Sequence, residues 1–460
     1  MVFSSPIFLF VFLPLVTTIY YLIKQSYRNA WLLASSILFY AWGEPIYVII
    51  MLIIIFLAYL AGMGSKFAYR KRATILFVVI SLSFLFYFKY LNFFIKTIND
   101  IFMVQLSYLE IVMPIGISFF IFQSISYVID VYRGEVNVQE NPFKLALYIA
   151  FFPQLIAGPI VKYHDIERYI DKRNETFEDV IGGIKRFIIG LSKKVLLANV
   201  VGKVADDIFA AGVGNIDLAT AWLGAIAYTF QIFFDFSGYS DMAIGLGRMF
   251  GFHFLENFNY PYVADSITDF WRRWHISLST WFKEYVYIPL GGNRRGKLKT
   301  YRNLILVFLA TGIWHGANWT FIFWGLWHGA FLLLEKHFGF AFTPKHAMLK
   351  HFYALLVVVL GWVFFRVESL QEAFAYIKVM FGITQNSVIP FGVDYYLANK
   401  LIICLLFCAL FSIPVKLPNC INKYKISLNI ICNLSLLGLL FLSCMYIAGA
   451  TYNPFIYFRF

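Results

Sequence analysis

Long runs of apolar residues recur along the whole chain and constrain its fold more than any other feature. The runs cover residues 7–23, 30–61, 73–95, 111–129, 143–161, 180–204, 218–250, 303–334, 352–366, 400–415 and 426–449. A helix needs about 20 mostly apolar residues to cross a bilayer, and several runs hold enough for two, so we expect roughly 10 to 12 membrane helices. The sequence predicts an all-α, polytopic integral membrane protein with a single transmembrane domain over residues 1–460.

The composition agrees with this fold class. Hydrophobic residues make up 60% of the chain and charged residues only 14%, whereas soluble domains average about 25% charged residues. The five cysteines all follow residue 400 and show neither metal-ligand spacing nor a disulfide framework, so we expect small buried apolar side chains and no metal site. They are Cys404, Cys408, Cys420, Cys432 and Cys444.

The net charge of +13 is interpreted as a signal of membrane topology, because cytoplasmic loops are enriched in Lys and Arg. Lys24 and Arg28 follow the first apolar run, which predicts an extracytoplasmic N-terminus. No basic segment precedes that run, so it does not resemble a cleaved signal peptide. A cytoplasmic turn before the last run is marked by Lys416, Lys423 and Lys425. The tail, residues 450–460, is therefore also expected outside the cytoplasm. The basic loops suit anionic membrane lipids, and no motif indicates nucleic-acid binding.

Residues 250–300 differ in character from the rest of the chain. A turn-rich break at 257–262 precedes a segment, 266–290, in which aromatic and charged residues alternate. Polar backbone at membrane depth is tolerated only where protein covers it or where it lines water. We therefore predict an amphipathic, re-entrant region that faces the cytoplasm and lines a central cavity or tunnel. The basic loop at 291–299 suits lipid head groups and, equally, the phosphates of a nucleotide-like donor.

Two WHGA tetrads place His315 and His328 in apolar sequence, and His275 lies upstream in a Trp-Arg-Arg-Trp-His segment. Ionisable residues within a membrane are costly and therefore suggest a function, although a single histidine also serves as a hydrogen-bonding residue between helices. On one unbroken helix, 13 residues correspond to roughly 220° of rotation. His315 and His328 would then point to nearly opposite sides, so we do not expect them to serve one site together.

The block that carries these tetrads resembles the signature of the membrane-bound O-acyltransferase family. It reads Gly-Ile-Trp-His-Gly-Ala-Asn-Trp-Thr-Phe over 312–321 and Trp-Gly-Leu-Trp-His-Gly over 324–329. Further matches lie at 234–243, 271–279 and 361–366. The chain is most similar to the bacterial branch that contains the membrane subunits of alginate and peptidoglycan O-acetyltransferases.

The resemblance implies catalytic roles for His315, which matches the near-invariant family histidine, and for His275, which matches the second polar residue of the family site. Acyl transfer from a thioester needs a base for the attacking hydroxyl, a task that suits histidine. It also needs donors for the developing oxyanion, such as His275 or the indole N–H groups of Trp274 and Trp281. Tunnel-lining or supporting positions are expected for Trp274, Trp281, Trp314, Asn318 and His328.

The resemblance further implies acetyl-CoA as the donor, taken from the cytoplasm. Arginine and lysine side chains match phosphate groups well. The candidates for binding the phosphates of the donor are Arg272, Arg273, Arg294, Arg295 and Lys297.

The chain ends on a F-x-Y-x-x-F pattern formed by Phe455, Tyr457 and Phe460. This pattern resembles the terminal motif of a small companion subunit in the related D-alanine export system, and it predicts that Tyr457 carries the acetyl group. An acetyl ester of a phenol stays activated, and its transfer to an alkyl hydroxyl is downhill. The alternative interpretation is an aromatic anchor at the membrane interface.

We therefore predict an O-acetyltransferase of the bacterial inner membrane that passes acetyl outward for O-acetylation of a cell-envelope polysaccharide. Peptidoglycan is slightly favoured over alginate or another exopolysaccharide on composition alone. The chain contains no soluble hydrolase-like region, so the expected acceptor of the acetyl group is a separate periplasmic or membrane-anchored SGNH-type O-acetyltransferase. The alternatives are a proton-coupled polysaccharide or lipid transporter and a histidine-ligated di-metal oxidase.

Three charged residues within the matched segments 234–243 and 361–366 receive structural interpretations. Asp235 and Asp241 are expected to make hydrogen bonds between packed helices. Arg366 is expected to pair with the nearby Glu368.

Overall fold

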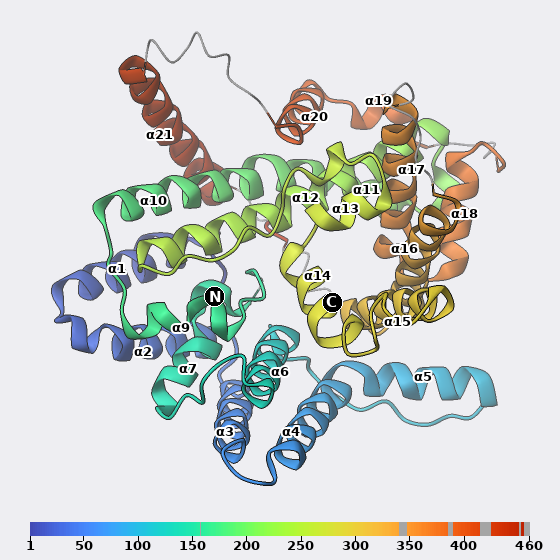
Figure 1. The fold of residues 1–460 in the computed structure, drawn as a ribbon. Helices are drawn as coiled ribbons and strands as arrows, with labels where there is room; N and C mark the ends of the chain where they lie inside the picture. The colour runs from blue at the N-terminus through green and yellow to red at the C-terminus, as the bar shows by residue number, and fades with distance from the viewer. Residues whose placement is uncertain (157, 340–346, 385–389, 415–424, 450–451, 455–460) are drawn as a thin grey trace. The chain divides into compact units, whose positions relative to one another are not determined.

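The computed structural model describes residues 1–156, 158–339, 347–384, 390–414, 425–449 and 452–454. Every regular element within these ranges is a helix, which confirms the all-α prediction for the described part of the chain (Figure 1). The described residues fall into two compact units, Met1–Phe187 with Ser240–Leu255 and Ile188–Tyr239 with Glu256–Phe460. Two long helices, α10 (Phe177–Ser192) and α12 (Leu218–Met249), contribute residues to both.

The first unit is built from short and medium helices around α6. Besides parts of α10 and α12, its elements, α6 included, are η1 (Phe8–Phe12), α1 (Leu13–Leu22), α2 (Gln25–Gly43), α3 (Val48–Gly64), α4 (Arg70–Leu85), η2 (Phe86–Tyr90), α5 (Leu91–Phe102), α6 (Ile117–Arg133), α7 (Pro142–Ala150), α8 (Phe152–Leu155) and α9 (Tyr163–Asp171). Helix α6 packs against α3 and α4, and nearly all of its side chains are buried. Arg28, one of the basic residues that predict a cytoplasmic segment after the first apolar run, pairs with Glu175 at 2.8 Å.

The second unit contains the segments that the motifs singled out. Its elements are η3 (Lys193–Ala198), α11 (Asn199–Ala211), η4 (Val213–Asn215), η5 (Pro261–Val263), α13 (Ile267–Arg273), α14 (Ile276–Phe282), η6 (Lys283–Tyr287), α15 (Lys297–His315), α16 (Trp319–Phe338), α17 (Ala347–Arg366), α18 (Leu370–Met380), α19 (Val393–Tyr396), α20 (Asn399–Phe411) and α21 (Lys425–Gly449).

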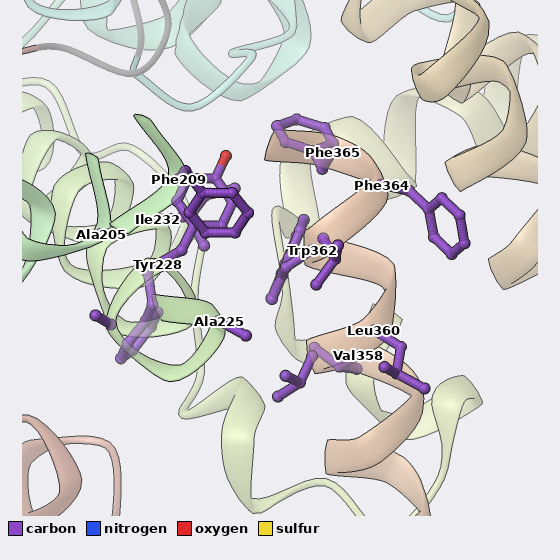
Figure 2. Close-up of a cluster of buried hydrophobic side chains, with 14 of the residues drawn as sticks. Ala205, Phe209, Ala225, Tyr228, Ile232, Val358, Leu360, Trp362, Phe364 and Phe365 are labelled. Carbon is purple, nitrogen blue, oxygen red and sulfur yellow. The ribbon is translucent and has the colours of Figure 1, made fainter. Parts of the chain in front are cut away.

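Helix α17 lies at the centre of the hydrophobic core of the second unit. Figure 2 shows Trp362 on the side of α17 that faces Phe209 and Tyr228, while Phe364 points the other way. The ring of Phe364 packs against Phe323 of α16, with 4.5 Å between the ring centroids. Because α17 buries side chains in two directions, it connects α11 and α12 with α16.

Apolar helices support the prediction of a membrane protein. Among the residues that the structure describes, three stretches are long and apolar enough to cross a bilayer, namely Arg70–Phe102, Ala347–Arg366 and Asn429–Gly449. Shorter apolar helices in the same described ranges cover Phe8–Leu22, Val48–Gly64 and Asn399–Phe411. On α21, Leu434 and Phe441 are each more than 60% exposed, as expected for side chains that face lipid. The larger number of spans expected from the sequence, and the single domain, remain predictions.

Residues 250–300 form short pieces rather than one spanning helix. After an extended stretch, α13 and α14 are each seven residues long, and the loop before α15 contains Gly291, Gly292 and Gly296, all with positive φ. Positive φ favours glycine, which has no Cβ to clash with the backbone. The turn-rich break expected at 257–262 lies in largely non-helical backbone before α13. The re-entrant placement of this region remains a prediction.

Candidate functional site

The two WHGA histidines lie on different helices. His315 is the last residue of α15, and α16 begins at Trp319. Asn318 explains the new start, because its side-chain oxygen accepts a hydrogen bond from the Thr320 amide at 3.1 Å and so caps the helix. Its amide group also donates to the Glu368 carbonyl at 2.8 Å. The assumption of one unbroken helix was wrong, so the expected 220° separation does not apply.

Glycines of the motif hold α15 and α16 at close range. A Cβ atom added to Gly312 would lie 2.4 Å from the Phe321 carbonyl oxygen, and one added to Gly325 would lie 2.3 Å from the Phe308 carbonyl oxygen. Real Cβ atoms essentially never approach an oxygen so closely. The two helices therefore need glycine at both positions, which explains part of the motif by packing rather than by chemistry.

His315 is 4% exposed and lies among three aromatic rings. The centroid of its ring is 4.9 Å from that of Trp314, 4.9 Å from that of Trp324 and 5.2 Å from that of Phe365. Phe365 comes from α17, and Trp324 comes from α16. Three helices therefore fix the position of this imidazole.

His275 is fully buried and occupies the turn between α13 and α14 with φ of 43°. Its Nδ1 lies 3.1 Å from Oδ1 of Asn257. The same oxygen accepts hydrogen bonds from the amide and the hydroxyl of Ser277, at 3.2 Å and 2.9 Å. A backbone amide only donates, so this atom of Asn257 is the carbonyl oxygen, and a carbonyl oxygen only accepts.

It follows that Nδ1 of His275 carries the proton. In a neutral imidazole the other ring nitrogen, Nε2, then carries the lone pair. Burial favours the neutral form of an imidazole. No hydrogen-bond partner for Nε2 lies in the described part of the chain. Neutral His275 therefore presents a hydrogen-bond acceptor, and the expectation that it donates to an oxyanion does not fit this arrangement.

The side chain of Trp314 lies beside both His275 and His315. Its indole ring lies 6.1 Å from the ring of His275 and 4.9 Å from the ring of His315, measured between centroids. His275, in the turn before α14, and His315, at the end of α15, are 40 positions apart in the sequence and lie beside the same side chain. The rings of His275 and Phe236, which belongs to α12, are 4.6 Å apart.

His328 is fully buried beside Trp324, whose ring lies 5.2 Å from it. Trp271 packs against the same imidazole at 5.3 Å. A Cβ atom on Gly361 would lie 2.9 Å from Nε2 of His328, so glycine at 361 leaves space for this ring. Among the described residues, neither ring nitrogen of His328 has a hydrogen-bond partner. His328 and His315 therefore share a tryptophan neighbour although they lie on separate helices.

The two other tryptophans of the candidate set are buried in different surroundings. Trp274 packs against Trp362 at 4.9 Å and against Phe258 at 5.0 Å. Trp281 lies at the end of α14, where it packs against Phe282 and Tyr285.

The basic residues predicted to bind the phosphates of a donor differ in their exposure and in their contacts within the protein. Arg273 pairs with Asp269 at 2.7 Å and donates to the Asn259 carbonyl at 3.3 Å. Arg272 is exposed, as are Arg294 and Arg295 of the loop before α15 and Lys297, the first residue of α15. A glycine-rich loop with exposed guanidinium and ammonium groups fits a phosphate ligand, because glycine allows the backbone to approach the ligand closely.

Sequence reasoning missed several polar residues that support the site. Asn257 fixes the tautomer of His275, and Glu335 caps α13 by accepting hydrogen bonds from the amides of Ile267 and Thr268, at 2.6 Å and 2.9 Å. Neither residue stands in a recognisable motif. Only the turn-rich break around Asn257 was a signal.

The expected pair of Arg366 with Glu368 was wrong. Arg366 instead binds Asp206 of α11 at 2.8 Å. The helix-packing interpretation of the two aspartates on α12 is confirmed, since Asp235 pairs with Lys194 at 2.7 Å and Asp241 pairs with Arg186 at 2.6 Å.

Some of the predicted positions lie outside the described residues, namely Tyr457 with the rest of the terminal pattern, Lys416, Lys423 and Cys420. Within the described ranges, no group of three or more His, Cys, Asp or Glu side chains is arranged to hold a metal ion.

Comparison with known proteins adds to this geometry. Residues 139–371 match the model of the membrane-bound O-acyltransferase family. The chain is 47% identical to a probable alginate O-acetylase of Pseudomonas aeruginosa over 83% of this chain and 75% of that protein. It is 37% identical to a peptidoglycan O-acetyltransferase of Helicobacter pylori, over 84% and 81%. It is 30% identical to a teichoic acid D-alanyltransferase of Bacillus subtilis, over 44% and 53%. His275, Trp314 and His315 all lie within the matched region.

Proposed function

The chain belongs to the membrane-bound O-acyltransferase family, and we propose that it takes acetyl from cytoplasmic acetyl-CoA and passes it across the inner membrane for O-acetylation of a cell-envelope polysaccharide. Acyltransferase activity follows from the family. The observation that carries the finer proposal is the packing of His275 and His315 against the same indole, that of Trp314.

His315 serves in this proposal as the general base. An attacking hydroxyl gives its proton to the imidazole as its oxygen forms a bond to the thioester carbonyl carbon. The carbon–sulfur bond then breaks, and the proton passes from His315 to the leaving sulfur. Burial among Trp314, Trp324 and Phe365 excludes water, which limits loss of the acetyl group by hydrolysis.

His275 serves as a second hydrogen-bond acceptor. Its Nε2 lone pair orients a hydroxyl or accepts a proton, whereas the donors for the oxyanion come from indole N–H groups such as that of Trp274. The donor molecule supplies an activated thioester. The exposed Arg294, Arg295 and Lys297, with Arg272, are the residues of this chain suited to its phosphates.

Tyr457 is proposed to receive the acetyl group first and to release it outside the cytoplasm to a separate SGNH-type transferase. This arrangement requires the C-terminal tail to be extracytoplasmic, and the basic residues after the first apolar run favour the same side for the N-terminus. The relatives named for alginate share more identity with this chain than the peptidoglycan relative does. Their similarity favours an alginate-like exopolysaccharide as the final acceptor over peptidoglycan, the slight preference from composition.

A complementation experiment tests the proposal. A strain without the gene receives the wild-type chain, His315→Ala or His337→Ala, and ester-linked acetate is measured separately in peptidoglycan and in exopolysaccharide. His337 is an exposed histidine on α16, so its variant is the matched control. We expect His315→Ala to lower acetate in one fraction roughly 100- to 10,000-fold, the usual effect of removing a general base, with His337→Ala unchanged. Wild-type acetate levels with His315→Ala would refute the assignment.

A further inference from the structure

The last described residues of the chain are each held by a polar contact in the second unit. The Tyr452 hydroxyl donates to Asp206 of α11 at 2.6 Å. The Asn199 amide group, at the start of α11, donates to the Asn453 side-chain oxygen at 3.3 Å. The Lys194 ammonium donates to the Pro454 carbonyl. Three consecutive residues after α21 are thus fixed by three different partners.

The contact with Pro454 is part of a buried ion pair. Lys194 and Asp235 are 2.7 Å apart, and each side chain is 2% exposed. Taking an ammonium and a carboxylate out of water is energetically unfavourable, and further hydrogen bonds are needed to offset this cost. The carbonyl of Pro454 supplies one such bond to Lys194. The end of the chain therefore completes a buried polar network rather than lying loosely on a surface.

Apolar packing does little to hold this end of the chain. Helix α21, which leads to it, exposes most of its side chains, and only 6% of its most apolar window is buried. Its Ser443 hydroxyl lies 3.4 Å from that of Ser192. With so little buried surface on α21, the polar contacts of residues 452–454 are the main described restraint on where the chain goes next.

The contact of Tyr452 with Asp206 is connected to His315, the proposed general base, through the end of α17. Asp206, the acceptor for Tyr452, pairs with Arg366 at 2.8 Å. The residue before Arg366 is Phe365, whose ring packs against the His315 ring at 5.2 Å. One end of α17 therefore contacts both the anchor of the chain end and the imidazole.

We propose that Lys194, Asp235 and Asp206 form a latch that positions the C-terminal segment for acyl transfer. The term latch is used below for these three residues and their contacts with residues 452–454. The proposal rests on the proposed function, in which Tyr457 accepts the acetyl group. Three residues of extended chain span at most about 11 Å, so fixing Pro454 limits the positions that Tyr457 can reach. The three latch residues are positioning residues, because they act through the tail.

A disulfide cross-link tests the latch without reference to activity. Asn199→Cys and Asn453→Cys are introduced together into a chain whose five native cysteines are replaced by Ala, and oxidation in membranes is followed by mass spectrometry. We expect rapid disulfide formation. Lys194→Met combined with Asp235→Asn removes both charges with little change in volume and should lower the initial rate at least about tenfold.

The matched control is Arg186→Met with Asp241→Asn, which neutralises another ion pair of α12 and should leave the cross-linking rate unchanged. An equal rate in the Lys194 and Asp235 double variant would overturn the latch, whatever the outcome of activity measurements.

A rescue experiment separates positioning from simple stability. The Lys194 and Asp235 double variant should lose roughly 10- to 100-fold in acetyl output, the scale expected when a reacting group is misplaced by about 1 Å. Closing the disulfide between positions 199 and 453 in that background should restore the output, and a reductant should abolish it again. Tyr452→Phe should also lower the output, while Tyr446→Phe on α21 should not.

The outcomes distinguish the latch from the relay. If the disulfide forms as expected but does not restore output, the latch does not position the tail for catalysis. If Tyr457→Phe retains full output, Tyr457 does not carry the acetyl group and that part of the proposed function fails. The cross-linking result still decides whether the latch exists.

Discussion

At the residue scale, the tautomer of His275 is set by one oxygen atom. Asn257 Oδ1 accepts from the Ser277 amide and from Nδ1 of His275, so the lone pair of the neutral ring is on Nε2. A motif match identifies a histidine but not which of its nitrogens carries the proton. The sequence identified His275 as a candidate and offered it as one of three possible oxyanion donors, with Trp274 and Trp281. The hydrogen bonds of Asn257 do not fit a donor role for Nε2 of neutral His275.

The tautomer leads to a prediction for Asn257. Asn257→Leu removes the acceptor and should lower acetyl output roughly tenfold or more, because a residue that orients a functional histidine through a hydrogen bond commonly contributes that much. Asn257→Asp keeps the acceptor and should retain much more activity. The measurement is acetyl-CoA consumption by purified protein in lipid vesicles with the acceptor present. Equal activity of the Leu and Asp variants would show that the Asn257 contact does not matter.

Contact partners distant in sequence could not be predicted at this scale. Arg366 was assigned to Glu368, two positions away, but binds Asp206, 160 positions earlier. Sequence proximity favours local pairs. Whether a long side chain at a helix end turns to a local or a distant carboxylate depends on which helices pack beside it. Likewise, nothing in the sequence indicated that Lys194 and Asp235 form an ion pair.

At the element scale, Glu335 of α16 stabilises the start of α13. Its carboxylate accepts from the amides of Ile267 and Thr268 and from the Thr268 hydroxyl at 2.6 Å. A carboxylate at a helix N-terminus satisfies free amides and interacts favourably with the helix dipole. This contact fixes α13, which leads directly into Trp274 and His275.

Glu335→Ala is accordingly expected to destabilise the protein by about 1–2 kcal/mol and to reduce acetyl output. Thermal unfolding in detergent, monitored by tryptophan fluorescence, provides the measurement. Lys336→Ala, at the neighbouring exposed position, is the control and should unfold like the wild type. Identical unfolding temperatures for the two variants would contradict the capping role.

The close contact of α15 and α16 leads to a second prediction at this scale. Gly325→Ala places a methyl group 2.3 Å from the Phe308 carbonyl oxygen, so the helices must separate. We expect a loss of stability of about 1–3 kcal/mol, typical of overpacking, and a shift of Trp324 away from His315. Gly438→Ala is the matched control, since nothing lies within 4 Å of a Cβ at that position on α21. Unfolding curves that coincide for the two alanine variants would rule out the packing role.

Helix boundaries were partly readable from the sequence. The Gly-Ala-Asn segment after His315 includes a good helix-capping residue, and Asn318 does cap α16. The calculation of relative orientation nevertheless assumed an unbroken helix. Apolar residues continue across the break and conceal it, because a membrane protein keeps hydrophobic composition even where the backbone leaves the helix.

At the scale of the whole molecule, the apolar runs identified the fold class, since only helices satisfy backbone hydrogen bonds within one segment in lipid. The motif spacing also selected histidines that contact one tryptophan. Hydropathy does not specify which helices pack together, so it could not identify α17 as the element that joins the core, His315 and the anchor of the chain end. Those relations depend on tertiary contacts between residues far apart in the chain.

In the proposed mechanism, His315 acts as the general base while acetyl passes from acetyl-CoA to Tyr457 of this chain before export. Intact-mass spectrometry of the purified protein after incubation with isotopically labelled acetyl-CoA tests this most directly, with wild type, His315→Ala and Tyr457→Phe compared. The account predicts that wild type gains the mass of one labelled acetyl group and that neither variant does. A gain in His315→Ala equal to that of wild type, or no consumption of acetyl-CoA by wild type with its acceptor present, would contradict it.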